Sequence, residues 1–68
     1  MKQRITLVEQ QNGVKLFVQR FERAAYIPDD WFVIDLDDLV SSFESEREAR
    51  AHFERQASRA RVRRLAGI

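Results

Sequence analysis

Ser45-Glu46-Arg47-Glu48 separates the part of the sequence with strand periodicity from the part with helix periodicity. The stretch is a capping box, in which the serine hydroxyl can accept a hydrogen bond from the backbone amide of Glu48 and the glutamate side chain can reach back. Good helix formers follow, with no glycine or proline before Gly67. Apolar residues recur in this segment at helical spacing: Ala49, Phe53, Ala57 and Ala60. The sequence therefore predicts a C-terminal helix whose apolar stripe has one large side chain.

The residues before the capping box alternate with the two-residue period of β-strands. Ile5 and Leu7 alternate with polar residues. The pair Asn12-Gly13 predicts a tight hairpin turn, because both residue types tolerate positive φ. Strands are also predicted at three later segments, of which the last is the least distinct: residues 14–21, 31–34 and 39–43.

Aspartates mark the predicted turns on either side of the third strand. They are Asp29 and Asp30 before it, and Asp35, Asp37 and Asp38 after it. The order of strands followed by one helix predicts an α+β fold. We expect an antiparallel three- to four-stranded sheet with one C-terminal helix packed on it, in a single small domain that spans residues 1–68.

The composition excludes several classes of protein. The 68 residues are 44% hydrophobic and 34% charged, with a net charge of +1, which is not the profile of a disordered chain. There is no cysteine, so disulfides and thiolate metal sites are excluded. No apolar run approaches the length of about 18 residues that a membrane span needs, and the N-terminal segment lacks the pattern of a signal peptide. We therefore expect a cytoplasmic protein without membrane contact.

Strands 14–21 and 31–34 are apolar on both faces, although a single helix can cover only one face of the sheet. In the first of these strands Leu16 and Phe17 point in opposite directions, and in the second Val33 and Ile34 do so. An uncovered apolar face indicates association, most simply a homodimer. The residues predicted to take part in it are all aromatic: Phe17, Phe21, Trp31 and Phe32.

Residues 32–40, FVIDLDDLV, are similar to the first motif of haloacid dehalogenase-type phosphatases, in which an apolar strand precedes Asp-x-Asp. That chemistry also needs a lysine after the motif, whereas the only lysines, Lys2 and Lys15, precede it. The pattern lacks the glycine of a calcium-binding EF-hand loop. His52, the only histidine, has no second histidine or cysteine for a metal pair. We expect no catalytic residue, metal or cofactor.

The charges divide along the chain. Residues 29–54 have a net charge of −7, and residues 55–68 have a net charge of +5 from arginine alone. Arginines near a helix C-terminus complement the helix dipole and can neutralise the acidic segment; they can also bind phosphate or dock a protein. The candidates lie where the apolar stripe breaks down, so the last turn is expected to fray, bend or pack elsewhere: Arg59, Arg61, Arg63 and Arg64.

Residues 43–49, FESEREA, preceded by WFV at 31–33, resemble the arm-binding module of phage-type integrases and the related AP2-like domains. The resemblance implies a sheet that enters a DNA groove and presents basic and aromatic side chains. In this sequence aspartates stand at those strands instead, and phosphate contact requires basic residues. Nucleic acid is therefore the less favoured partner.

The hypothesis for function is a small non-catalytic protein-interaction module. It would be an adaptor, regulator or inhibitor that acts through protein–protein contact with an unidentified partner. Small chains of this type occur among phage and mobile-element proteins, which is an analogy of type alone. The alternative is a nucleic-acid-binding module that uses the arginine-rich C-terminal helix.

Overall fold

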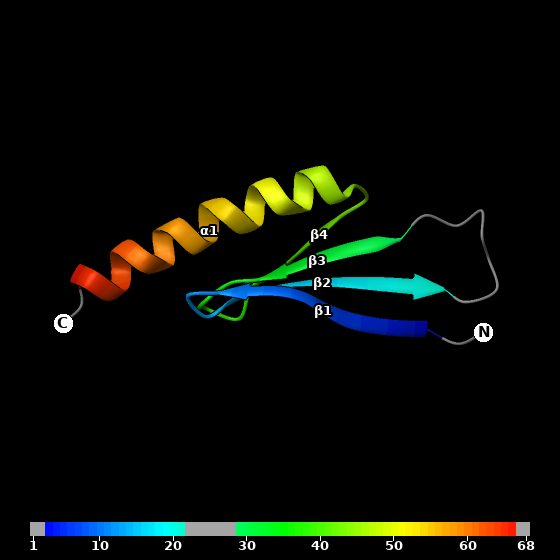
Figure 1. The fold of residues 1–68 in the computed structure, drawn as a ribbon, viewed down its shortest axis with the longest axis horizontal. Coiled ribbons are helices and arrows are strands. Elements are labelled where there is room, and N and C mark those ends of the chain that lie inside the picture. Colours follow the sequence, from blue (N-terminus) through cyan, green and yellow to red (C-terminus); the bar gives the residue numbers. More distant parts are fainter. Residues whose placement is uncertain (1–2, 22–28, 67–68) are drawn as a thin grey trace.

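The computed structural model describes residues 3–21 and 29–66, which form a four-stranded sheet and one helix (Figure 1). The strands are antiparallel and lie in the sheet in sequence order. The helix packs on one face of this sheet, which confirms the predicted α+β fold. The elements are β1 (Gln3–Gln11), β2 (Val14–Phe21), β3 (Asp30–Ile34), β4 (Val40–Phe43) and α1 (Glu46–Ala66).

The predicted hairpin turn connects β1 to β2. Asn12 and Gly13 have φ angles of 53° and 86°, the left-handed conformation that the Asn-Gly pair indicates. The Asn12 side-chain amide donates a hydrogen bond to the carbonyl oxygen of Ala57, at 3.1 Å. The turn residue that shapes the hairpin therefore also attaches it to the helix.

The aspartates after β3 form a structural turn. Asp35 Oδ1 accepts hydrogen bonds from the backbone amides of Asp37 and Leu39, at 2.9 and 3.1 Å, and Asp38 adopts a φ of 61°. This is the role that the sequence predicted for them. Of the two aspartates before β3, Asp30 differs from the expectation, because it begins the strand and pairs with Gln19 instead of lying in a turn.

The core lies between α1 and the central strands. Phe53 and Leu16 are among its largest fully buried side chains. Three of the buried helix positions are alanines, so the helix backbone approaches the sheet closely around Phe53. The other members of the core are Val14, Val18, Trp31, Val33, Ala49 and Ala60.

The helix extends past the sheet at its C-terminal end, where it projects beyond the β1–β2 turn (Figure 1). It packs against β2, β3 and β4, and its last core residue is Ala60. Beyond that point Val62 and Leu65 are 65% and 66% exposed. The expected fraying of this end is wrong, because α1 continues through Ala66, whereas a bend or packing elsewhere stays a prediction. Its intrahelical hydrogen bonds continue past the apolar core, where no buried apolar contact supports the described helix residues.

The serine half of the predicted capping box forms at the start of α1. The backbone amide of Glu48 donates to Ser45 Oγ at 3.2 Å, and the amide of Ala49 donates to the Ser45 carbonyl oxygen at 3.1 Å. Replacing Ser45 with alanine removes the first of these bonds, so we expect the free energy of unfolding to fall by about 0.5–2 kcal/mol. Urea unfolding measures the loss. Ser58→Ala, on the exposed side of the same helix, is the control, and an equal effect of the two substitutions would contradict the role of the cap.

Candidate functional site

The sheet has one face that the helix does not cover, and we call it the open face. Residues that pair across neighbouring strands point to the same side, so the pairing assigns each side chain to a face. Phe17 pairs with Leu7 on one side and with Phe32 on the other, at the centre of the open face. The open face consists of Ile5, Leu7, Gln10, Lys15, Phe17, Gln19, Phe21, Asp30, Phe32, Ile34, Val40 and Ser42.

A β-bulge decides which residues of β1 reach the open face. In the register set by the turn at residues 12–13, Leu7 would lie opposite Val18, whose side chain is in the core. The register shifts directly after Leu7, so that Leu7 lies opposite Phe17 and Ile5 opposite Gln19. Bulges commonly redirect side chains in this way. The shift therefore adds two aliphatic side chains to the open face.

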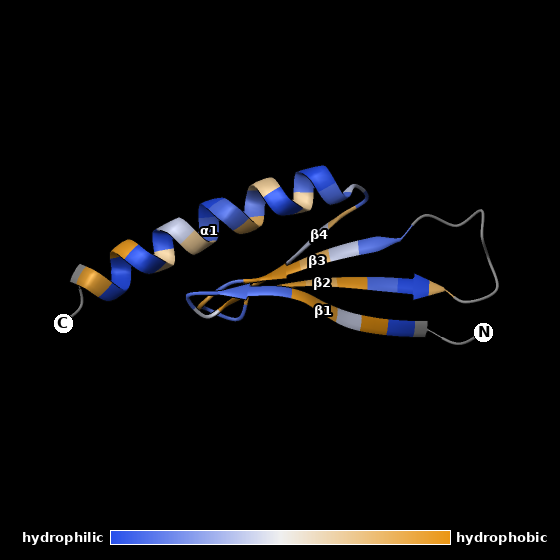
Figure 2. Ribbon diagram, viewed as in Figure 1, coloured by the Kyte–Doolittle hydropathy of each residue, from blue (hydrophilic) through white to orange (hydrophobic). Residues whose placement is uncertain are grey.

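The middle of the open face is apolar and accessible. Hydrophobic residues are concentrated in the strands, whereas the helix is largely hydrophilic (Figure 2). Ile5 and Val40 are each 62% exposed, although Val40 pairs with Ile34 and Ile5 lines the same depression as Phe17. A shallow depression of about 230 Å³ lies between them. It is lined by Ile5, Phe17, Gln19, Phe32, Ile34 and Val40.

Three of the four aromatic residues predicted for association lie on the open face: Phe17, Phe21 and Phe32. The fourth, Trp31, is on the other side, where it is only 8% exposed and belongs to the core. Trp31 alternates with Phe32 along β3, so the two side chains cannot share a face. The grouping of Trp31 with the other three is therefore corrected.

The prediction missed the aliphatic members of the face. Ile5 and Leu7 were recognised as strand residues, but their side of the sheet depends on the bulge. Ile34 could have been assigned from its alternation with Val33. Val40 required the position of β4, the least distinct of the predicted strands.

The open face bears one base and one acid, at opposite ends of its apolar centre. Lys15 lies two residues before Phe17 on β2, and Asp30 lies two residues before Phe32 on β3. Among the described residues, neither has an ion-pair partner. The other polar side chains of the face are uncharged: Gln10, Gln19 and Ser42.

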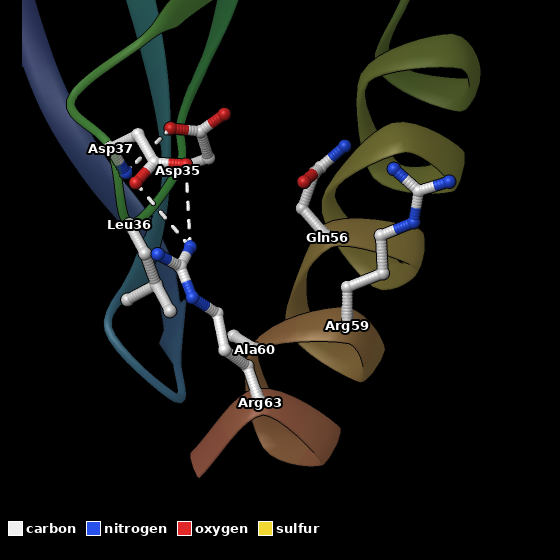
Figure 3. Close-up of a pocket in the computed structure, with 7 residues that line it drawn as sticks. All are labelled: Asp35, Leu36, Asp37, Gln56, Arg59, Ala60 and Arg63. Carbon is white, nitrogen blue, oxygen red and sulfur yellow. Dashed lines mark hydrogen bonds and ion pairs between the residues drawn. The ribbon is translucent and has the colours of Figure 1, made fainter. Parts of the chain in front are cut away.

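The predicted arginines gather at the overhanging end of α1, and one of them meets the acidic segment. Arg63 donates to both carboxylate oxygens of Asp37 at 3.3 Å, and the two residues lie on a pocket between the helix and the β3–β4 turn. Figure 3 shows Arg63 reaching toward this turn and Arg59 directed away from it. Arg61 and Arg64 line a different depression, beside Asn12. The structure thus joins one of the four predicted arginines to the acidic segment, and all four are exposed.

At its other end the helix is joined to the sheet edge through Arg50. Its guanidinium lies 2.8 Å from the Glu46 carboxylate and 3.5 Å from that of Glu9 on β1. The pKa of Arg50 is raised, chiefly by the hydrogen bond to Glu46. These exposed contacts orient the helix more than they stabilise it.

The described residues include no group of three or more histidine, cysteine, aspartate or glutamate side chains placed to hold a metal ion. His52 contacts the ring of Phe43, with centroids 5.2 Å apart. The one helix in the described part of the chain does not combine the length and hydrophobicity that a membrane crossing requires. Known protein families, curated proteins and solved structures show no match to this chain.

Proposed function

We propose that this chain is a small non-catalytic protein-interaction module, an adaptor, regulator or inhibitor that binds protein through the open face of its sheet. The observation that carries the proposal is the apolar centre of this face, with Ile5, Leu7 and Val40 accessible around Phe17 and Phe32. Contiguous apolar surface of this kind is typical of an interaction site.

The chemistry of the open face suits a protein surface better than a phosphate backbone. Its centre can exclude water against apolar side chains, which provides a driving force roughly proportional to the area buried. Its single base, Lys15, is balanced by a single acid, Asp30, at the opposite end of the apolar centre. A phosphate-binding surface requires several basic side chains.

Two occupants are expected from the sequence: a second copy of the chain, as in a homodimer, and an unidentified protein partner. Both would use the same face. The cytoplasmic location, the absence of cofactors and the likeness to phage or mobile-element proteins remain predictions of the sequence. No membrane partner is proposed.

Binding of nucleic acid through the helix end is the second candidate. One observation favours it: Arg61 and Arg64 line a depression beside Asn12, apart from the acidic turn that Arg63 contacts. This leaves a small basic surface on the overhang. It offers fewer basic contacts than the extended basic surfaces of nucleic-acid-binding proteins, so we expect no tight binding at physiological salt.

Site-specific photo-crosslinking in the native cells distinguishes these functions. A photoreactive side chain at Gln19, inside the depression of the open face, is expected to form covalent adducts with protein. The same side chain at Glu54, on the exposed side of α1, is the matched control and should form few. A third probe at Arg61 tests the overhang.

Protein adducts at Gln19 that exceed those at Glu54 would support the open face as the binding surface. Equal yields at the two positions would contradict it. Adducts to nucleic acid at Arg61, lost when the salt concentration is raised, would favour the second candidate.

A further inference from the structure

We propose that the occupant of the open face is a second copy of this chain, related by a two-fold axis that lies between the two sheets, over the centre of the Phe17–Phe32 pair. In this arrangement Lys15 of each copy meets Asp30 of the other. The inference rests on the proposed function and specifies the partner of the same face.

The pattern of charge on the open face supports this axis. Phe17 and Phe32 are directly opposite each other in the antiparallel pair β2–β3. Lys15 and Asp30 each lie two residues before one of these phenylalanines, so they are equally distant from the centre and on opposite sides of it. Their charges are opposite, and neither is neutralised by another side chain among the described residues.

A symmetric dimer uses the same surface of both copies, so this surface must be complementary to itself. When two open faces stack, a two-fold axis in the plane between them can exchange the position of Lys15 with that of Asp30. It then creates two identical ion pairs on opposite sides of the apolar centre. The Phe17–Phe32 pair of one copy packs on the same pair of the other, and the strands of the two sheets cross obliquely, as packed sheets do.

The resulting assembly has two sheets inside and one helix on each outer surface. Every sheet face is then covered, which removes the apolar exposure of Ile5 and Val40. The open face presents about a dozen side chains, fewer than the roughly 20–30 of a standard interface. We therefore expect a dissociation constant in the micromolar range.

Charge exchange tests the axis. In the Lys15→Asp homodimer the new aspartate of each copy meets Asp30 of the other, which gives two repulsive contacts between acids. In the Asp30→Lys homodimer the new lysine meets Lys15, which gives two repulsive contacts between bases. By sedimentation equilibrium at low salt, we expect each single variant to raise the dissociation constant by at least about tenfold. An equimolar mixture of the two variants restores both ion pairs and should recover wild-type affinity. The double variant Lys15→Asp/Asp30→Lys restores both ion pairs in its own homodimer, so it should have wild-type affinity without a second chain.

Circular dichroism confirms that each variant is folded. The matched control follows fluorescently labelled Lys15→Asp mixed with unlabelled Asp37→Lys, so that only dimers containing Lys15→Asp are seen. Asp37 lies on the β3–β4 turn, outside the open face, so this heterodimer keeps one acid–acid contact. Recovery by Asp30→Lys but not by Asp37→Lys supports the axis.

Two results would overturn the inference. One is a wild-type dimer that neither single variant weakens, which would mean a different mode of association. The other is a wild-type chain that remains at 8.1 kDa up to about 100 μM. Protein adducts at Gln19 with another protein would then still support the proposed function, and their absence would contradict that function as well.

Discussion

Replacing Phe53 with alanine is expected to lower the free energy of unfolding by about 3–5 kcal/mol. Phe53 is 1% exposed and is the one large side chain among the buried positions of α1. The flanking alanines are too small to fill the cavity that the substitution leaves. Because a domain of this size has a small total stability, we expect the variant to be largely unfolded at 37 °C.

Thermal and urea unfolding followed by circular dichroism measure this loss. Val62→Ala removes an apolar side chain from the same helix where it is 65% exposed, and should change stability by less than about 0.5 kcal/mol. An unchanged midpoint for Phe53→Ala would mean that the helix is not docked through this residue in solution.

A glutamate at position 16 is expected to unfold the domain, whereas a glutamate at position 17 is expected to leave it folded. Leu16 is completely buried beneath α1, and none of the buried residues that the structure describes is polar or charged. Burying an unpaired charge costs several kcal/mol, which is most of the stability of a small domain. Phe17 is on the open face, and a charge there remains in contact with water.

These neighbouring substitutions place the same chemical change on opposite faces of β2. Circular dichroism reports folding, and sedimentation reports association. Phe17→Glu should yield a folded monomer, because the charge would be desolvated in the proposed dimer. A folded Leu16→Glu together with an unfolded Phe17→Glu would show that the helix covers the other face.

The features that were predictable from the sequence are those that depend on neighbouring residues. Asn12-Gly13 specifies its turn through backbone conformation, and Ser45 specifies the helix start through one local hydrogen bond. The aspartates after β3 likewise form bonds within their own loop. Each of these signals has a short range, so the sequence displays it directly.

The features that could not be predicted depend on contacts between distant segments. Alternation along β3 shows that Trp31 and Phe32 point to opposite faces, but only docking of the helix decides which face is buried. The position of Arg63 beside Asp37 depends on the angle at which the helix crosses the sheet. Continuation of α1 past its apolar stripe was missed for a different reason. The helix propensity that the sequence displays up to Gly67 sufficed where packing ended, although the stripe had broken down.

Because of the bulge, β1 can lose one residue without any of its other side chains changing to the opposite face of the sheet. The turn determines which face of the sheet Glu9 and Gln10 occupy, and the apolar pattern determines the face of Ile5 and Leu7. These two pairing registers differ by one residue, and Val8 is the extra residue between them. A chain that lacked Val8 would pair in one regular ladder with both sets of side chains on their present faces. Loss of a second residue at the same place would move Ile5 and Leu7 to the helix side. A single deletion here is thus neutral for the open face, and a double deletion removes its β1 border.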